Sequence, residues 1–348
     1  MTSPIETVDA VVPSLPTALS WRDTAKRWSL RWGIGRGSSR VEPGLYRLGE
    51  PAPSSAVLVT CNYRMTVDLV RRDLAGVDCW LLVLDTYGVN VWCAAGKGTF
   101  GTDELVRRIF AAHLSDHVDH TTLVLPQLGA PGVAAQTVRE LTGYRVVGGP
   151  IRSRDLRAFL SAHLEATPEM RAVTFTLRER IVLAPVELVG SLRWWWTTLV
   201  LIALAVLGAS IGAARFLPGA ALMAMFPALL TYAIGAVAGA LLVPVLLPWL
   251  PGRAFSLKGA VAGVALALVA LLALPGMLGL SNPWAWAAVL LGAGALASYV
   301  GVNFTGSTPY TSPSGVEREL RRAIPLQAAA LAISLICWTV AWATGIGA

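Results

Sequence analysis

Charged residues are scarce in this chain, at 14% of its 348 residues, whereas a soluble globular domain carries about 25%. The scarcity is uneven along the chain. Residues 1–193 hold most of the charges and all four histidines, and residues 194–348 contain long apolar runs. Because an apolar run of about 18 residues or more is typical of a membrane-spanning helix, we expect a soluble domain fused to a multi-span membrane domain.

Cysteine is also rare, with four residues and no CxxC pair. This argues against a structural zinc site or an iron–sulfur cluster built by this chain alone. The first 50 residues contain Pro4, Pro13 and Pro16 and no apolar stretch long enough for a secretory signal. The soluble domain is therefore expected in the cytoplasm, where thiols stay reduced.

The net charge of +7 has two interpretations. It fits the positive-inside bias of membrane proteins, and it also fits a basic patch that docks an acidic redox partner. The basic and aromatic pattern of known nucleic-acid modules is missing, so we expect no nucleic acid as a partner.

Four regions are expected along the chain. Residues 1–50 form an irregular N-terminal arm, residues 51–180 an α/β domain, residues 181–193 a linker and residues 194–348 the transmembrane domain. Within the arm, Trp21, Trp28 and Trp32 alternate with Arg and Lys and could form a short amphipathic helix. Such a helix could lie on the membrane surface or pack on the soluble domain.

Apolar strands alternate with amphipathic helices between residues 56 and 176. This predicts a Rossmann-like α/β domain with a mainly parallel sheet, covered by helices on both faces, whose ligands bind at the carboxyl ends of the strands. The expected strands are residues 56–60, 80–84, 122–125, 145–147 and 173–176, and the expected helices are residues 65–75, 102–114, 132–142 and 153–164.

Five transmembrane helices are expected in the second half. They are residues 195–214, 221–248, 257–278, 284–304 and 325–345, the second of which holds Pro227 and Pro244 and could be kinked; splitting it would give six. Basic residues gather in alternate loops, which predicts a multi-pass protein of the cytoplasmic membrane with the soluble domain inside and the C-terminus outside. Acidic, Lys and His side chains are not expected at membrane depth. Since transporters and pumps need such groups there, this half is interpreted as an anchor and partner platform.

One short run stands out in the soluble half: Asn90, Val91, Trp92, Cys93, Ala94, Ala95, Gly96 and Lys97. The preceding strand ends near Asp85, so Cys93 should reach the ligand edge of the sheet on a short helix. A helix N-terminus and the nearby Lys97 would favour its thiolate, and the small residues after it leave room for something broad. The alternative is a buried structural cysteine.

Two other chemistries use a lysine or a cysteine like those of this run. A phosphate-binding loop needs G-x-x-x-x-G-K-[ST], and the run fails because Val91 stands where glycine is needed and Gly98 follows the lysine. A nucleophilic Cys–His pair stays open, because four histidines are present. None of them has a recognisable family context; they are His113, His117, His120 and His163.

The run resembles the signature N-[VI]-W-C-A-[AG]-G-K of HgcA, the membrane-anchored corrinoid proteins of microbial mercury methylation, and it matches all eight positions. The resemblance implies a domain similar to the corrinoid-binding domain of the corrinoid iron–sulfur protein, followed by five membrane spans. It implies a corrinoid-dependent methyltransferase that uses methyl-Co(III) corrinoid to methylate Hg(II), giving methylmercury. A ferredoxin-like partner with two [4Fe-4S] clusters (HgcB type) and a folate-linked methyl donor are implied as well.

The resemblance also implies a role for Cys93 as the lower axial ligand of cobalt in a cobalamin-type corrinoid. Thiolate is a soft, strongly donating ligand, and an axial ligand tunes the metal of a macrocycle. The other residues of the run would shape the cap around it. Further cofactor contacts are expected from small or polar residues after the strands: Thr60, Thr66, Gln127, Gly129, Ala130, Gly132 and Gly149. The alternative is that these glycines only make turns.

Two rival functions remain at this point. The cofactor could serve a methyl acceptor other than mercury. Alternatively, the chain could be a non-catalytic membrane sensor or scaffold with a nucleotide-binding α/β domain, although the failed phosphate-loop match counts against this.

Overall fold

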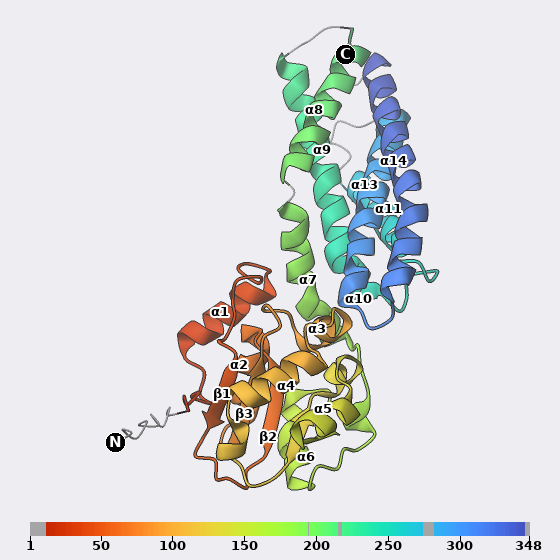
Figure 1. Ribbon diagram of the computed structural model, residues 1–348. Helices are drawn as coiled ribbons and strands as arrows, with labels where there is room; N and C mark the ends of the chain where they lie inside the picture. The colour runs from red at the N-terminus through yellow and green to blue at the C-terminus, as the bar shows by residue number, and fades with distance from the viewer. Residues whose placement is uncertain (1–11, 194, 215–217, 274–281, 345–348) are drawn as a thin grey trace, which may run out of the picture. The chain divides into compact units, whose positions relative to one another are not determined.

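The computed structural model describes residues 12–193, 195–214, 218–273 and 282–344. Its contacts divide the chain into two compact units. One, called here the α/β unit, comprises Met1–Leu30 and Ile34–Val173. The other, the helical unit, comprises Arg31–Gly33 and Thr174–Ala348. Figure 1 shows a sheet with surrounding helices in the first unit and long helices in the second.

The α/β unit is built on one five-stranded sheet in the order β1-β3-β2-β4-β5. The inner strands run parallel and β1 pairs antiparallel with β3 at one edge. The mainly parallel sheet is thus confirmed. The strands are β1 (Gly44–Leu48), β2 (Val57–Cys61), β3 (Cys79–Leu84), β4 (Thr122–Leu125) and β5 (Arg145–Gly148).

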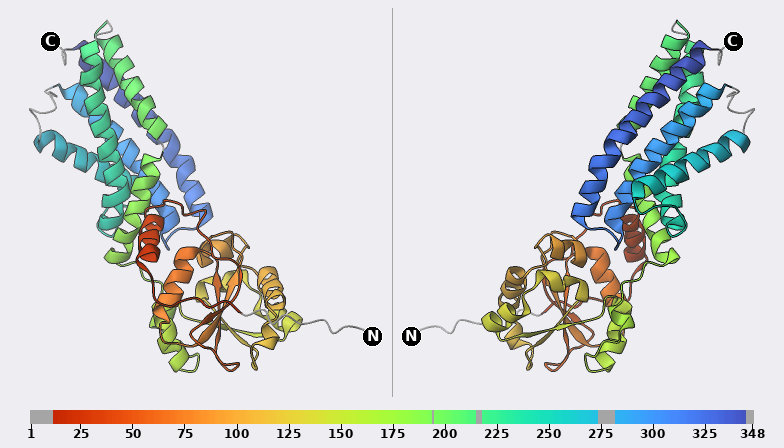
Figure 2. Two further views of the ribbon diagram at one scale, coloured as in Figure 1. Left: turned by 90° about the vertical axis from the view of Figure 1, so that its left-hand side faces the viewer. Right: turned by 90° about the vertical axis from the view of Figure 1, so that its right-hand side faces the viewer.

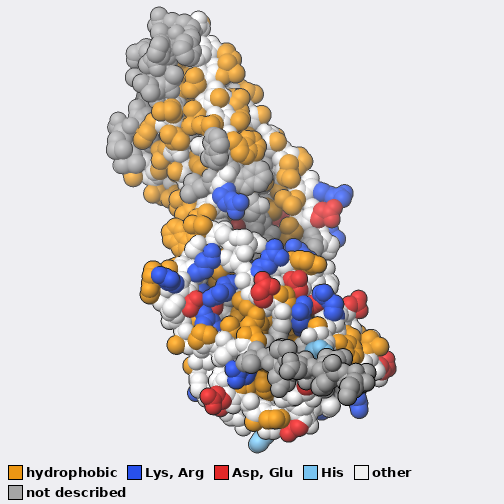
Figure 3. Space-filling model, turned by 60° about the vertical axis from the view of Figure 1, so that its left-hand side comes forward, with side chains coloured by type: hydrophobic (Ala, Val, Ile, Leu, Met, Phe, Trp, Pro, Cys, Tyr) orange, Lys and Arg blue, Asp and Glu red, His pale blue; other side chains and the backbone are white. Residues whose placement is uncertain are grey.

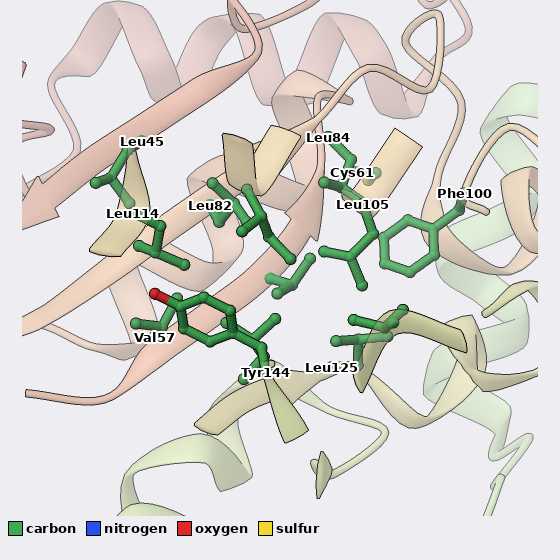
Figure 4. Packing of buried hydrophobic residues seen from close by; sticks show 14 of the residues in the cluster. Leu45, Val57, Cys61, Leu82, Leu84, Phe100, Leu105, Leu114, Leu125 and Tyr144 are labelled. Atoms are coloured by element: carbon green, nitrogen blue, oxygen red, sulfur yellow. The ribbon is translucent and has the colours of Figure 1, made fainter. Parts of the chain in front are cut away.

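Every residue of β2 and β3 is buried, which shows that both faces of the sheet are covered. On one face, Val57, Val59 and Cys61 pack with side chains that include Phe100, Leu105 and Tyr144 (Figure 4). On the other, Leu58 and Val83 pack with residues of α2 and with Phe159 of α6. The covering elements are α2 (Arg64–Asp73), α3 (Val91–Gly96), α4 (Thr102–Ala111), α5 (Ala135–Thr142) and α6 (Leu156–Ser161).

Two stretches differ from the expected secondary structure. Strand β1 lies within residues 1–50, which were expected to be irregular. The expected strand at residues 173–176 is wrong: these residues pair with no strand and lead into α7 (Leu177–Leu192), which fills the expected linker. The turn begins where the N–H of Thr176 donates to Glu179 Oε2 at 2.7 Å. The threonines of residues 173–176 therefore belong to the start of a helix and not to a strand.

Helix α1 (Trp21–Arg31) forms as the pattern of the arm predicts. Its start is held by Ser20 and Asp23, since Ser20 N–H donates to the Asp23 carboxylate at 3.0 Å and Asp23 N–H donates to the Ser20 hydroxyl at 3.1 Å. This reciprocal capping satisfies donors that a helix N-terminus leaves unpaired.

The helical unit contains several long apolar helices, which lie side by side in Figure 2. Among the described residues, four helices are long and apolar enough to cross a membrane, and the bent pair α7–α8 would make a fifth if it counts as one span. Five spans therefore stay a prediction. The helices are α8 (Trp195–Gly212), α9 (Pro218–Val237), α10 (Val243–Leu246), α11 (Phe255–Ala273), α13 (Pro283–Asn303) and α14 (Pro313–Ala343). Residues 274–278 of the expected third span and residue 345 lie outside the described residues.

A π-helical turn at Ala238–Leu242 joins α9 to α10. The second expected span is thus continuous, with its irregularity just before Pro244, where the ring removes a backbone donor. Small residues allow close packing against α13, as expected. A Cβ at Gly235 would lie 2.5 Å from Leu296 Cβ, and one at Gly263 would lie 2.6 Å from Ala293 O.

Lys258 falls at the start of the expected third span, residues 257–278, although lysine was not expected there, and it lies in the first turn of α11. It is buried, and its ammonium donates to Leu247 O at 2.9 Å and to Leu250 O. The lysine therefore satisfies carbonyl groups that the end of the preceding helix leaves unpaired.

Candidate functional site

The strand order brings three strand ends together at one edge of the sheet. The chain passes from β2 to β3 on one side and then crosses to β4 on the other side of β2. In open α/β sheets, ligands bind outside the carboxyl ends of the strands at such a switch point. The segments that follow β2, β3 and β4 begin at Asn62, Asp85 and Pro126, and they form the candidate site.

Asn62 holds the loop after β3 in place. This buried side chain accepts hydrogen bonds through Oδ1 from Thr86 N at 3.1 Å, from the Thr86 hydroxyl at 3.0 Å and from Gly88 N at 2.9 Å. Its amide nitrogen donates to Asp85 at 2.9 Å. Within this loop Tyr87 and Gly88 have φ of 56° and 74°, which confirms the expected break after the strand. One side chain thus fixes the backbone that leads to Cys93.

Glu104 supports the same loop from α4. Its carboxylate accepts from Asp85 N at 2.7 Å and pairs with Arg108 at 2.8 Å and with Arg107. Sequence reasoning missed this role and that of Asn62. For Asn62 the available signal was a polar residue directly after an apolar strand, at the edge of the sheet where ligands bind.

Helix α3 presents Cys93 to solvent. Asn90 caps the helix, since its side-chain oxygen accepts from Cys93 N at 2.9 Å. Val91, Ala94 and Ala95 are buried against the core, whereas Trp92 and Cys93 are exposed. The alternative of a buried structural cysteine is therefore wrong for Cys93, whereas Cys61, Cys79 and Cys337 are buried.

The rest of the run completes a short exposed cap. Trp92 keeps 46% of its surface exposed. Gly96 is exposed, and no heavy atom lies within 4 Å of where its Cβ would be. Lys97 ends the helix, with its backbone N–H donating to Cys93 O at 3.1 Å. Space beside Cys93 is thus open on the side of Gly96.

The segment after β4 packs tightly against α3. It forms a 3-10 turn at Gln127–Gly132. A Cβ at Gly129 would lie 2.5 Å from the Phe100 ring, and one at Gly132 would collide with Phe100 O and lie 3.1 Å from Ala95 Cα. These two glycines are needed for close packing, which accounts for them without a ligand. Ala130 is exposed, and Gln127 exchanges long hydrogen bonds of 3.5 and 3.3 Å with Arg171.

Three further residues were expected to contact the cofactor: Thr60, Thr66 and Gly149. Thr60 is buried and, because side chains alternate along a strand, it shares the sheet face of Leu58 rather than that of Cys61. Burial raises the pKa of the Cys61 thiol, and a hydrogen bond with Thr66 opposes that rise. Gly149 N donates to Leu125 O at 2.7 Å, and a Cβ there would lie 2.9 Å from Val124 Cγ1. Thr66 lies in the first turn of α2, which follows β2, and Gly149 directly follows β5, so both lie at the same edge of the sheet as α3.

Two of the histidines lie at the opposite edge of the sheet from Cys93. The His117 ring is 5.5 Å from Trp80, near the start of β3. His120 is bonded through both ring nitrogens, to Ser55 O at 2.9 Å and Thr122 N at 3.2 Å. Neither histidine is placed to activate Cys93. The described part of the chain also contains no group of three or more His, Cys, Asp or Glu that could hold a metal ion.

These observations define a class: an α/β domain with a parallel-sheet switch point and one exposed cysteine on a capped helix at that edge. Residues 34–160, within the α/β unit, match the family model of the CO dehydrogenase/acetyl-CoA synthase delta subunit.

Three curated relatives are acetyl-CoA decarbonylase/synthase complex subunits gamma. The Methanopyrus kandleri protein is 39% identical over 127 residues, which cover 36% of this chain and 27% of the relative. The Archaeoglobus fulgidus protein is 33% identical over 123 residues, covering 35% and 26%. The Methanocaldococcus jannaschii protein is 34% identical over 122 residues, covering 34% and 25%. This chain thus spans about a quarter of the length of these relatives.

Proposed function

We propose that the α/β unit binds a corrinoid at the switch-point edge, with the Cys93 thiolate as the lower axial ligand of cobalt, and that the protein transfers a methyl group to Hg(II). The observation that carries the proposal is the exposed Cys93 on capped helix α3. The similarity of residues 34–160 to subunits of a corrinoid protein family supports the cofactor.

The residues present fit such a group. A corrinoid is broad and flat, so a ligand from below must stand clear of bulky neighbours. Cys93 is exposed, Ala94 and Ala95 turn inward, and the position of Gly96 is open. A thiolate sulfur is a soft ligand suited to a transition metal. The open space for the group lies beside helix α3, because the space beside Gly129 and Gly132 is already filled by other residues of the protein.

The protein's own residues have three tasks in this proposal. Cys93 donates electron density to the metal, Asn90 fixes the cysteine backbone by capping the helix, and Asn62 holds the loop that carries both. When bound, the corrinoid supplies a cobalt centre that carries a methyl group from donor to acceptor. Electron donation by the Cys93 sulfur would suit an electrophilic acceptor such as Hg(II), because it would favour release of a methyl group together with its bonding electrons.

The partners follow from the resemblance of residues 90–97. We propose that electrons come from a ferredoxin-like protein with two [4Fe-4S] clusters of the HgcB type. We further propose a folate-linked methyl donor. The helical unit, whose visible face carries many hydrophobic side chains in Figure 3, would span the cytoplasmic membrane five times, with the α/β unit in the cytoplasm and the C-terminus outside.

The acceptor has a second candidate. The eight-residue match of residues 90–97 supports Hg(II). The names of the curated relatives favour instead a methyl carrier for an acetyl-CoA-forming enzyme. Both candidates share the corrinoid and Cys93 and differ only in where the methyl group goes.

The test uses the full chain loaded with corrinoid, beside the variants Cys93→Ala and Cys93→Thr. We expect a visible spectrum that changes in both variants, because neither side chain offers a soft donor. With reductant, the ferredoxin-like partner, a folate-linked methyl donor and Hg(II), wild type should form methylmercury and both variants should not. An unchanged spectrum in Cys93→Ala would refute the ligand role. Transfer of the methyl group from the loaded protein to an acetyl-CoA synthase, but not to Hg(II), would refute Hg(II) as the acceptor.

A further inference from the structure

Helix α1 has two opposite faces with different chemistry. Asp23 and Leu30, seven residues apart, share one face of the helix, because residues at this spacing align along a helix. Leu30 is fully buried, and Asp23 binds Arg64 at 2.7 Å and Arg71 at 2.9 Å. The helix is therefore fastened to the unit through this face.

The other face carries tryptophan. Trp21 and Trp28 are again seven residues apart and lie two residues out of step with Asp23 and Leu30, which turns them to the opposite side. They are 75% and 62% exposed. Ala25, between them on the same face, is exposed as well. Such exposure of two large apolar rings marks an interaction surface rather than a packing face.

Basic side chains border this tryptophan face. Arg22 and Lys26 are exposed and lie one turn apart along its side. The guanidinium of Arg22 lies 5.4 Å from the Trp21 ring centre. In Figure 3, Lys and Arg side chains lie beside hydrophobic ones on the visible face of the α/β unit. Tryptophan rings flanked by cations are typical of helices that lie at the headgroup level of a membrane.

We propose that the tryptophan face of α1, made of Trp21, Ala25 and Trp28 with Arg22 and Lys26 beside it, docks the α/β unit on an anionic lipid surface. The cations match anionic headgroups, and the rings match the interface between headgroups and acyl chains. The same chain carries helices of membrane length, so the bilayer is present at high effective concentration. The proposal rests on membrane insertion of those helices and not on the proposed cofactor.

The test is photocrosslinking of the full chain in lipid nanodiscs. A benzophenone amino acid replaces Trp28 in one variant and Phe110 in another, since Phe110 is a similarly exposed aromatic residue on α4, at 58%. With phosphatidylglycerol in the disc, we expect lipid adducts from position 28 and few from position 110. Adducts from position 28 to protein alone, whether to this chain or to an added partner, would overturn the proposal.

Charge reversal supplies the second arm. Arg22→Glu with Lys26→Glu, in the position-28 background, should lower lipid adducts by about fivefold for each cation removed in phosphatidylglycerol discs, and much less in phosphatidylcholine discs. Arg145→Glu, at an exposed basic residue on β5, should leave adducts unchanged. Equal yields in all three proteins would overturn the role of charge. A chain that never enters nanodiscs would instead refute membrane insertion, and with it this docking surface.

Discussion

Asn90 and Cys93 are joined by a hydrogen bond of 2.9 Å, from the cysteine backbone N–H to the asparagine side-chain oxygen. The residue that caps helix α3 thus also fixes the backbone of the only exposed cysteine among the described residues. The cap links two positions of the run that the sequence shows only as near neighbours.

Removing this cap should loosen Cys93. Asn90→Ala removes the acceptor, and loss of such a cap costs about 1 kcal/mol. Asn90→Asp keeps an oxygen in place and should behave like wild type. Amide hydrogen exchange at Cys93, measured in all three proteins, should be faster only in the alanine variant. Equal protection of Cys93 in the alanine variant and wild type would show that the cap does not hold the helix.

One thiol should react rapidly in the folded protein. Cys93 is exposed and the other three cysteines are buried. Burial raises the pKa of Cys61, and it raises that of Cys79 to about 12, so both stay neutral thiols at neutral pH and lack the reactive thiolate. Intact-mass analysis after brief maleimide treatment should show one label on wild type, none on Cys93→Ala and four on unfolded wild type. A second fast label on folded wild type would contradict the burial.

Replacing Asn62 should disturb the loop that leads to Cys93, although the two residues are far apart in the sequence. Asn62→Ala leaves the N–H groups of Thr86 and Gly88 without their acceptor, and an unpaired buried donor costs about 1–3 kcal/mol. We expect faster amide exchange at both residues and weaker corrinoid binding. Thr99→Ala is the matched control, because Thr99 makes only a 3.4 Å bond to Ala94 O through its hydroxyl. Wild-type exchange in Asn62→Ala would rule out the positioning role.

The sequence was informative where a run of residues determines its own structure. Strands β2 to β5 follow from short apolar runs, and the position of Cys93 follows from the end of β3. Strand β1 was missed because Gly44–Leu48 has only two buried side chains, Leu45 and Leu48, and is fixed by pairing with β3. The strand expected at residues 173–176 has β-favouring residues but no pairing partner, and strand propensity depends on such context.

In the candidate site, too, some features follow from the local sequence and others depend on tertiary packing. The exposed cysteine and the break at Tyr87 could be read from local pattern. The role of Asn62 depends on β2 and β3 lying side by side, which a single sequence does not display. The glycines after β4 were correctly noted as places without bulk. Whether that space admits a ligand or Phe100 depends on the tertiary packing, and Phe100 fills it.

Two glycines should therefore respond in opposite ways to the same substitution. At Gly132 a Cβ would collide with Phe100 O, whereas at Gly96 it would meet nothing within 4 Å. Gly132→Ala should destabilise the α/β unit, and Gly96→Ala should not, because alanine is the better helix former. If a corrinoid lies over α3, Gly96→Ala should still weaken its binding. Urea unfolding and corrinoid titration separate the two effects, and unaltered affinity in Gly96→Ala would place the cofactor elsewhere.

Acid should release helix α1 before it unfolds the sheet. Burial alone would raise the pKa of Asp23, but hydrogen bonds from Arg71 and Ser20 outweigh it and lower that pKa from 3.8 to about 2. A carboxyl whose pKa is lowered by folding stabilises the fold fully above its unfolded pKa, near 3.8, and loses that contribution as the pH falls to about 2. Protection factors of the α1 amides should therefore fall through this window in wild type. Asp23→Asn should show lower protection above the window and little change within it. Parallel curves for the two proteins would mean that the Asp23 contacts with Arg64 and Arg71 do not fasten the helix.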